Sequence, residues 1–250
     1  MSNSFEYICG LHAVRHALSL NSDRVLSIST ESKKKYNEEV NNILQLAEKN
    51  GVHREYVSKS TLDRYMKDTH HQGVVLKIKP YSAVGMVALD KILSNQKKTL
   101  HLFLILDGIQ DPQNLGACIR TANAVGVDAV IIPKDKSVGV TPVVRKVSSG
   151  GVENTLIVTA TNLSRTIKTL QDAGVWVVGA DAQAKESLYE VDLNIPLAIV
   201  IGSEGRGMRL NTQKHCDYLV KVPMHGAVES LNVSVVSGVF LYEALRQRRQ

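Results

Sequence analysis

The second half of the chain repeats one pattern, in which a short apolar run is followed by a stretch with helical spacing. Most of these runs are unbroken rather than alternating, which is typical of strands covered on both faces of a parallel sheet. Strands and helices in alternation predict a three-layer α/β domain. The expected strands lie at 102–106, 129–132, 156–159, 175–178, 197–201 and 218–222, and the expected helices at 115–125, 163–173, 208–215 and 233–248.

The first part of the chain mixes helices and strands differently and predicts a small α/β domain of its own. Pro80 interrupts the pattern, and the residues after it are mixed and end in a polar stretch. We therefore expect a domain at 1–80, a linker at 81–100 with one short helix near 87–93, and a second domain at 101–250. In the first domain the expected helices are 10–20, 36–49 and a short one at 61–66 capped by Ser60, and the expected strands are 24–29, 55–58 and 73–79.

The composition limits the class of protein. Of the 250 residues, 44% are hydrophobic, which is ordinary for a globular protein with a buried core. No stretch approaches the roughly 18 apolar residues of a membrane span, and the N-terminal segment lacks the basic and apolar regions of a signal peptide. We therefore expect no membrane association and a cytoplasmic location.

The charge and the cysteines narrow the choice of partners. A formal net charge of +6 is compatible with a polyanionic partner such as RNA, although neither part of the chain stands out as a basic arm. Cys9, Cys118 and Cys216 form no CxxC pair and no ligand spacing with histidine, which fits reduced thiols. We expect no metal site.

Three segments carry the chemistry, and each follows an expected strand, where ligands bind in open α/β sheets. The first begins with Asp107 and runs through a turn-rich loop into the helix at 115–125. Asn114 is placed to cap that helix, Gly116 allows close backbone approach, and Arg120 lies one turn further on the same face. Alone, this segment fits an ordinary loop with a capping Asn and a surface Arg equally well.

The second segment, 202–207, has three glycines in six residues, which lets backbone N–H groups face a ligand. Its order is neither the dinucleotide fingerprint nor a phosphate-binding loop, and Glu204 would repel phosphate. It therefore favours a ligand with positive charge, or a hydroxyl to be held; the alternative is a flexible turn. The third segment, 222–234, places Ser230, Asn232 and Ser234 between apolar neighbours at a helix start, which alone fits an ordinary helix cap.

Together the three segments resemble the SpoU/TrmH family of RNA 2′-O-ribose methyltransferases, with all three signature motifs in order across 102–250. Residues 10–14 and 71–73 resemble the L30e-like substrate-binding domain of one branch, the RlmB-type 23S rRNA guanosine-2′-O-methyltransferases, and residues 242–248 fit the same branch. The coinciding residues are the glycines of the motifs, Asn114, Arg120, Glu204, Ser230, Leu231 and Asn232.

The resemblance implies a fold that composition does not reveal. The family's catalytic domain is a SPOUT α/β trefoil knot, in which the C-terminal segment threads a loop, and knots are rare enough that only the motifs justify this expectation. The resemblance also implies a homodimer formed through the C-terminal domain, RNA as the substrate, most of all 23S rRNA, and S-adenosyl-L-methionine bound between the loops after the last strands.

The resemblance further implies a role for each motif residue. Arg120 acts on the ribose 2′-hydroxyl, either as a base or as a charged group that stabilises the developing alkoxide, and physical grounds favour the second because a guanidinium normally stays protonated. Asn114 orients Arg120 or the ribose, and Glu204 holds Arg120 or a substrate hydroxyl. Ser230 and Asn232 position the target nucleotide and shape the loop. The adenine edge of the cofactor is held by the backbone groups of Gly202, Val222 and Leu231, and the faces of the adenine ring are flanked by Ile201 and Met224.

Other functions fit the sequence less well. A dehydrogenase lacks support because the glycine fingerprint and its acidic partner about 20 positions later are missing. A non-catalytic RNA-binding module fits the N-terminal resemblance but not the three intact motifs. Within the family, a tRNA 2′-O-methyltransferase or a resistance-type rRNA methyltransferase is the main alternative, since the sequence shows no code for the target nucleotide.

Overall fold

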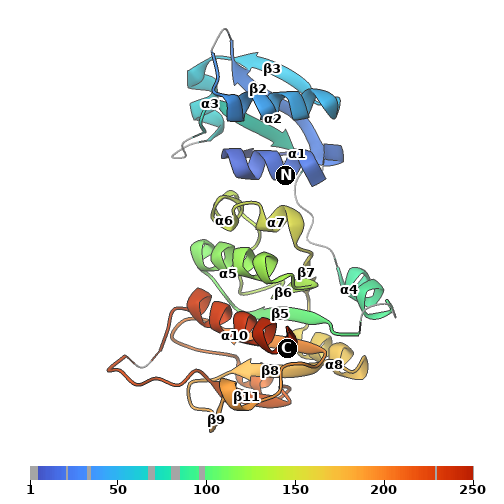
Figure 1. Ribbon diagram of the computed structural model, residues 1–250, viewed down its shortest axis with the longest axis vertical. Coiled ribbons are helices and arrows are strands. Elements are labelled where there is room, and N and C mark those ends of the chain that lie inside the picture. Colours follow the sequence, from blue (N-terminus) through green and yellow to red (C-terminus); the bar gives the residue numbers. More distant parts are fainter. Residues whose placement is uncertain are drawn as a thin grey trace. The chain divides into compact units, whose positions relative to one another are not determined.

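The computed structural model describes residues 5–20, 22–32, 35–66, 71–79, 85–95, 99–228 and 230–249. Within these residues the chain forms two compact units, which Figure 1 traces from the blue N-terminal elements to the red C-terminal helix. The first contains Met1–Ser82 together with Val140–Asn154, and the second contains Ala83–Gly139 together with Thr155–Gln250. The expected boundaries at 80 and 101 stay a prediction, because 80–84 and 96–98 lie outside the described residues.

The first unit is built on a four-stranded sheet in the order β1-β4-β2-β3. The β2–β3 pair is parallel, and the other two pairs are antiparallel. All helices and strands predicted for this unit are confirmed, although Ser58 rather than Ser60 caps α3, and β1, α6 and α7 add to them. Its strands are β1 (Glu6–Cys9), β2 (Val25–Glu31), β3 (His53–Val57) and β4 (Val74–Ile78), and its helices are α1 (Leu11–Leu20), α2 (Glu38–Lys49), α3 (Lys59–Tyr65), α6 (Pro142–Ser148) and α7 (Gly151–Asn154).

Helix α2 shows how local sequence builds the core of this unit. The side chain of Asn37 accepts a hydrogen bond from the backbone N–H of Val40 and so caps the helix. Ile43 and Ala47 lie four residues apart, on one helical face, and pack in the same buried cluster as Ile28 of β2. Burial of this apolar face holds α2 against the sheet.

Helices α6 and α7 belong to the first unit although their sequence interrupts the second. Arg145 of α6 is 1% exposed and forms ion pairs with Glu153 of α7 and with Glu6 of β1. Gly150, between the two helices, has a φ of +92°, and a Cβ there would lie 2.6 Å from the ring of His16 in α1. A buried charge needs such partners, which explains why 140–154 folds with β1 and α1.

The second unit is built on a seven-stranded sheet in the order β7-β6-β5-β10-β8-β11-β9, and every pair in it is parallel. The parallel sheet confirms the prediction from the unbroken apolar runs. Its strands are β5 (Leu102–Asp107), β6 (Ala129–Pro133), β7 (Ile157–Ala160), β8 (Trp176–Ala180), β9 (Glu186–Ser187), β10 (Leu197–Gly202) and β11 (Tyr218–Lys221), and its helices are α4 (Met86–Leu93), α5 (Pro112–Val125), α8 (Leu163–Asp172), α9 (Leu210–Gln213) and α10 (Val233–Arg248).

Both faces of this sheet are covered. Alternate side chains of the central strands, such as Phe103 and Val200, pack in one cluster with Leu89 of α4 and Ile167 of α8. Helices α5 and α10 lie side by side (Figure 1), and α10 also packs on β10. The result is the predicted three-layer α/β arrangement; the knot stays a prediction.

Two predicted elements differ from the structure. The helix expected at 87–93 is confirmed as α4, but it packs against the sheet and is part of the second unit. The helix expected at 208–215 shrinks to the single turn α9. None of the helices in the described parts of the chain has the length and apolar character that crossing a membrane requires.

Candidate active site

The first motif links β5 to α5. Asp111 is the N-cap of α5, because its side chain accepts from the backbone N–H of Gln113, and Pro112 occupies the first helical position. The prediction that Asn114 caps this helix is therefore wrong. Asn114 lies inside the first turn, is 8% exposed, and is free to direct its side chain elsewhere.

The glycine segment forms a tight loop at the end of β10. Ser203 and Gly207 exchange two backbone hydrogen bonds of 3.0 and 2.9 Å, and Gly205 and Gly207 both have positive φ. A Cβ at Gly202 would lie 2.1 Å from the backbone of Gly207 and Met208, so only glycine fits there. The backbone N–H groups of residues 203 and 207 are therefore used within the loop. Glu204 lies in the turn that these two hydrogen bonds close.

The three motifs meet at Glu204. The side-chain amide of Asn114 donates to Glu204 Oε1 at 3.0 Å, and the amide of Asn232 donates to the same oxygen at 2.6 Å. Asn232 also donates to Asn114 Oδ1 at 3.0 Å. The three side chains form a closed hydrogen-bonded triangle, although Asn114 lies 90 residues before Glu204 and 118 residues before Asn232 in the chain.

Asn232 has a second function in this arrangement. Its Oδ1 accepts from the backbone N–H and the hydroxyl of Ser234, which caps α10. One asparagine therefore fixes the start of α10 and binds the other two motifs.

Arg120 and Ser230 stand apart from the triangle. Both are exposed, and neither hydrogen-bonds nor ion-pairs with Asn114, Glu204 or Asn232 in the described residues. The expected orientation of Arg120 by Asn114 or Glu204 is thus not present here. An exposed guanidinium without such a partner is available to a phosphate or a ribose oxygen.

The candidate cofactor residues lie on loops at the carboxyl end of the sheet. Ile201 and Gly202 end β10, Val222 and Met224 follow β11, and Leu231 precedes the cap of α10. Ile201 is only 2% exposed and offers almost no surface to a ligand in this conformation.

The segment 222–231 suits a ligand that binds through backbone atoms. Within its described residues, which exclude 229, no backbone group hydrogen-bonds to another part of the chain. Unpaired N–H and C=O groups beside the glycine loop are what the adenine edge of S-adenosyl-L-methionine requires, so these residues fit the cofactor.

Asp107 is a further polar residue of this site, at the end of the otherwise apolar strand β5, and the motifs predicted no role for it. Its carboxylate is 1% exposed and accepts from the backbone N–H of Arg209 at 2.9 Å. The Arg209 guanidinium lies 3.5 Å from the same carboxylate and donates to the Lys136 carbonyl at 3.4 Å. Arg209 therefore joins the loops after β5, β6 and β10. A lone carboxylate after five apolar residues was the signal available in the sequence.

The thiols of this unit are held neutral. Burial raises the pKa of Cys118, which lies 3.3 Å from the hydroxyl of Ser237, to about 11. Burial also raises the pKa of Cys216 to about 12, with Asp217 and Asp107 adding to the rise. Neither sulfur suits nucleophilic catalysis at neutral pH. No cluster of three metal-binding side chains exists among the described residues.

Two family patterns match this chain. The SpoU rRNA Methylase family matches residues 101–242, and the RNA 2'-O ribose methyltransferase substrate binding family matches residues 7–84. The chain belongs to the SpoU rRNA methylase family. The candidate site of this SpoU methylase lies within the first of the two matched ranges.

Curated relatives match this SpoU methylase over nearly its whole length. A 23S rRNA (guanosine-2'-O-)-methyltransferase RlmB from Pseudomonas putida is 45% identical over 247 residues, which cover 99% of this chain and 98% of the relative. The protein of the same description from Vibrio vulnificus is 45% identical over 248 residues and covers 99% and 98%.

Solved structures support the same fold. A crystal structure of an RNA 2'-O ribose methyltransferase has a TM-score of 0.81 at 25% identity and covers 100% of this chain and 91% of the other. The SpoU methyltransferase AviRb from Streptomyces viridochromogenes, in complex with the cofactor AdoMet, has a TM-score of 0.83 at 21% identity and covers 99% and 91%.

Proposed function

We propose that this SpoU methylase transfers a methyl group from S-adenosyl-L-methionine to the ribose 2′-hydroxyl of a guanosine in 23S rRNA. The observation that carries the proposal is the triangle of Asn114, Glu204 and Asn232. It joins the three motifs at the carboxyl edge of the sheet, where the described residues of the segment 222–231 make no backbone hydrogen bond to the rest of the chain.

The relatives support 23S rRNA as the substrate. Relatives named for that reaction share 45% identity over 99% of the chain. The alternative of a tRNA substrate has narrower support, since the TrmH/SpoU tRNA modifying enzyme from A. aeolicus covers only 64% of the chain with a TM-score of 0.56. Ribosomal RNA as substrate also favours the cytoplasm as the place of action.

The cofactor supplies an activated methyl group on a sulfonium, and the protein has to position an oxygen in line with it and manage one proton. The O–CH3 bond forms as the S–CH3 bond breaks, and the hydroxyl proton leaves to a base or to water. Val222, Leu231 and Gly202 would hold the adenine edge through backbone groups, and Met224 would lie beside the ring, whereas the buried Ile201 offers it almost no surface. The triangle fixes the position of the Glu204 carboxylate, because Asn114 and Asn232 both donate to it.

Arg120 and Ser230 act on the RNA side. Because the Arg120 guanidinium is exposed, it can reach the 2′-oxygen and stabilise the negative charge that develops there. Ser230 and Asn232 position the target nucleotide. A base role for Arg120 is the alternative, and the Arg120→Lys variant separates the two roles.

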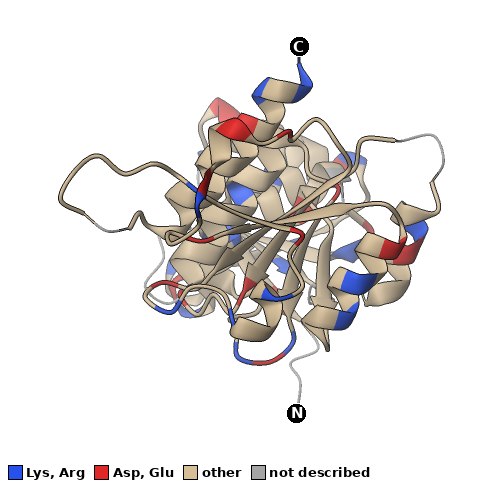
Figure 2. Ribbon diagram, turned by 90° about the horizontal axis from the view of Figure 1, so that it is seen from below, with Lys and Arg blue, Asp and Glu red and all other residues tan. Residues whose placement is uncertain are grey.

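The C-terminal helix supports a homodimer. Helix α10 buries Phe240, Leu241 and Ala244 against its own unit, yet leaves Val235 49% and Tyr242 54% exposed. The two exposed residues lie seven positions apart, on one face, and a helix that is apolar all round generally packs on both sides. Figure 2 shows that only the end of this helix is basic.

Calorimetry and methyl mapping test the proposal. The purified protein is expected to bind one S-adenosylhomocysteine per subunit and no NADH. Expression of the gene in a strain lacking its own 23S rRNA guanosine 2′-O-methyltransferase is expected to restore one methylated guanosine. Binding of NADH instead of the methyl donor, or a new methyl group only in tRNA, would contradict it.

A further inference from the structure

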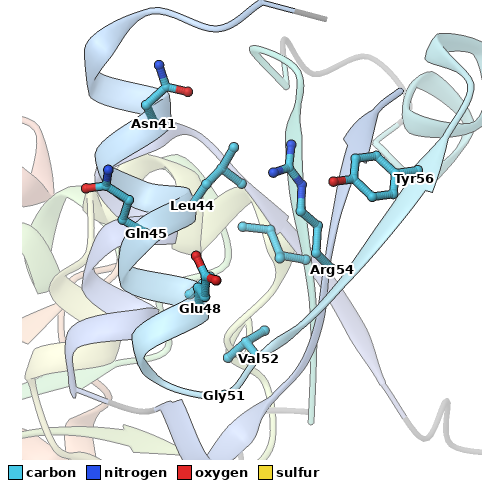
Figure 3. Close-up of a pocket in the computed structure, with 10 residues that line it drawn as sticks. Asn41, Leu44, Gln45, Glu48, Gly51, Val52, Arg54 and Tyr56 are labelled. Atoms are coloured by element: carbon cyan, nitrogen blue, oxygen red, sulfur yellow. The ribbon is translucent and has the colours of Figure 1, made fainter. Parts of the chain in front are cut away.

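The first unit contains a pocket of about 670 Å³ between α2 and the strands β2 and β3 (Figure 3). This volume lies within the range of sites that hold small organic ligands. Its floor is apolar and closed, since Ile28 and Ala47 are fully buried. Its lining residues are Ile28, Asn41, Leu44, Gln45, Ala47, Glu48, Gly51, Val52, Arg54 and Tyr56.

One wall of the pocket is a fixed arginine beside an exposed ring. Arg54 and Tyr56 project from the same face of β3 because they are two residues apart. The Arg54 guanidinium carbon lies 4.8 Å from the centre of the Tyr56 ring, and its Nε donates to Thr30 Oγ1 at 3.0 Å. Tyr56 is nevertheless 62% exposed, so this ordered pair presents its surface to solvent.

The Arg54 guanidinium has unused hydrogen-bonding capacity. Of the residues that the structure describes, none accepts a hydrogen bond from its two terminal nitrogens. A planar cation over an aromatic ring, with donors left over, is the surface on which RNA-binding proteins stack unpaired bases.

The opposite wall carries polar groups of α2. Figure 3 shows Leu44 pointing from the helix toward the strand that bears Arg54 and Tyr56, with Asn41 and Glu48 on either side of it along the helix. The lining contains one cation and one anion, so the pocket has no net charge to attract a phosphate backbone. It suits a flat, neutral group with hydrogen-bonding edges.

We propose that this pocket takes an unpaired base of the RNA substrate, stacked on the Arg54–Tyr56 pair with its edge toward the polar side chains of α2. The proposal rests on the proposed function, because it assigns the pocket to that enzyme's RNA. It separates target selection from chemistry: the base held here orders the RNA, and the methyl transfer takes place in the second unit.

The test measures RNA affinity and turnover of the full-length protein on a 23S rRNA fragment that the wild type methylates. Tyr56→Ala is expected to raise the RNA Kd and KM about 5- to 100-fold, the scale of losing one stacked base. Turnover at saturating RNA and binding of S-adenosylhomocysteine are expected to stay unchanged. Tyr56→Phe keeps the ring and is expected to bind RNA like the wild type.

Arg54→Lys and Tyr189→Ala complete the design. Arg54→Lys keeps the charge but loses the planar surface, so a several-fold rise in the RNA Kd is expected. Tyr189 is 55% exposed in the second unit, and Tyr189→Ala serves as the matched control. Thermal unfolding checks that each variant is folded.

Two results would overturn the inference. One is an unchanged RNA Kd and KM for folded Tyr56→Ala while the wild type methylates the fragment, which leaves the proposed function intact. The other is tight binding of free GMP or AMP that Tyr56→Ala abolishes without changing the RNA Kd, which would make the pocket a nucleotide site. If the wild type methylates no rRNA, the proposed function itself fails.

Discussion

The backbone N–H of Arg209 donates a 2.9 Å hydrogen bond to the buried carboxylate of Asp107, which lies 102 residues earlier in the chain. The same arginine returns its guanidinium to that carboxylate at 3.5 Å. This double contact closes the glycine loop onto the end of β5, next to the position where Gly202 pairs with Asp107. The loop that presents Glu204 is therefore anchored at both of its ends.

Asp107→Ala should destabilise the protein because the N–H of Arg209 loses its buried acceptor. A loss of about 1–3 kcal/mol in the free energy of unfolding is expected, together with weaker binding of S-adenosylhomocysteine. Asp172→Ala is the control, since its ion pair with Lys168 is exposed on both sides and such pairs contribute little to stability. Urea unfolding and calorimetry give both quantities. Equal effects of the two substitutions would contradict the anchoring role of Asp107.

Asn232→Asp should separate helix capping from the triangle. Aspartate caps a helix as well as asparagine does, so α10 keeps its start. The substituted carboxylate, however, stands where an amide donates to Glu204 at 2.6 Å, and two carboxylates at this distance repel. Turnover is expected to fall more for Asn232→Asp than for Asn232→Ser, which keeps a cap without the charge. The idea is lost if both variants methylate RNA at the same rate.

Arg120→Ala should reduce turnover by about a hundredfold or more while leaving stability and cofactor binding nearly unchanged. The exposed position of Arg120 explains why the fold does not depend on it. Arg165→Ala, at another exposed arginine in α8, is the control and should keep full turnover. Wild-type turnover of Arg120→Ala on its RNA would move the catalytic assignment elsewhere.

Arg120→Lys distinguishes the two roles of this residue. If the charge alone matters, lysine restores part of the rate with little new dependence on pH near neutrality. If Arg120 is the base, the rate of the lysine variant should climb toward the lysine pKa, about 10 when unperturbed.

Stability should depend on Cys216 above about pH 9. Burial raises the pKa of this thiol from 9.0 to about 12, so the unfolded chain loses its proton first as the pH rises. The stabilisation that the neutral thiol provides is complete below pH 9 and is lost between pH 9 and 12. The difference in Tm between wild type and Cys216→Ala should thus shrink toward alkaline pH. A constant difference from pH 7 to 11 would argue against it.

The strands β5, β6 and β10 were predictable because every residue of these apolar runs is buried, whereas the two-residue strand β9 is polar and was not predicted. The cap of α5 was misplaced on Asn114, although Asp111 followed by Pro112 is the stronger local signal. The true partner of Asn114 is Glu204, 90 residues away, and no local pattern reveals a contact of that span. The partner of Asp107, Arg209, is likewise distant, 102 residues away, although the lone carboxylate at the end of an apolar strand was a local signal for Asp107 itself.

Helices α6 and α7 show what the sequence pattern left out altogether. Both helices are short. The two carboxylates that pair with Arg145 are far apart in sequence, because Glu6 lies near the start of the chain and Glu153 lies in α7. From the sequence alone Arg145 would be taken for an arginine on the surface, whereas its side chain is buried in the structure.

The segment 140–154 has a consequence for recombination. The chain leaves the second unit after Gly139, contributes α6 and α7 to the first unit, and returns at Thr155. A hybrid that received only a foreign copy of 1–82 would bring that copy together with α6 and α7 of the original chain, so Arg145 would lose the Glu6 with which it now pairs. Exchange of the first unit between family members, in nature or by design, therefore requires two separate stretches of gene to move together.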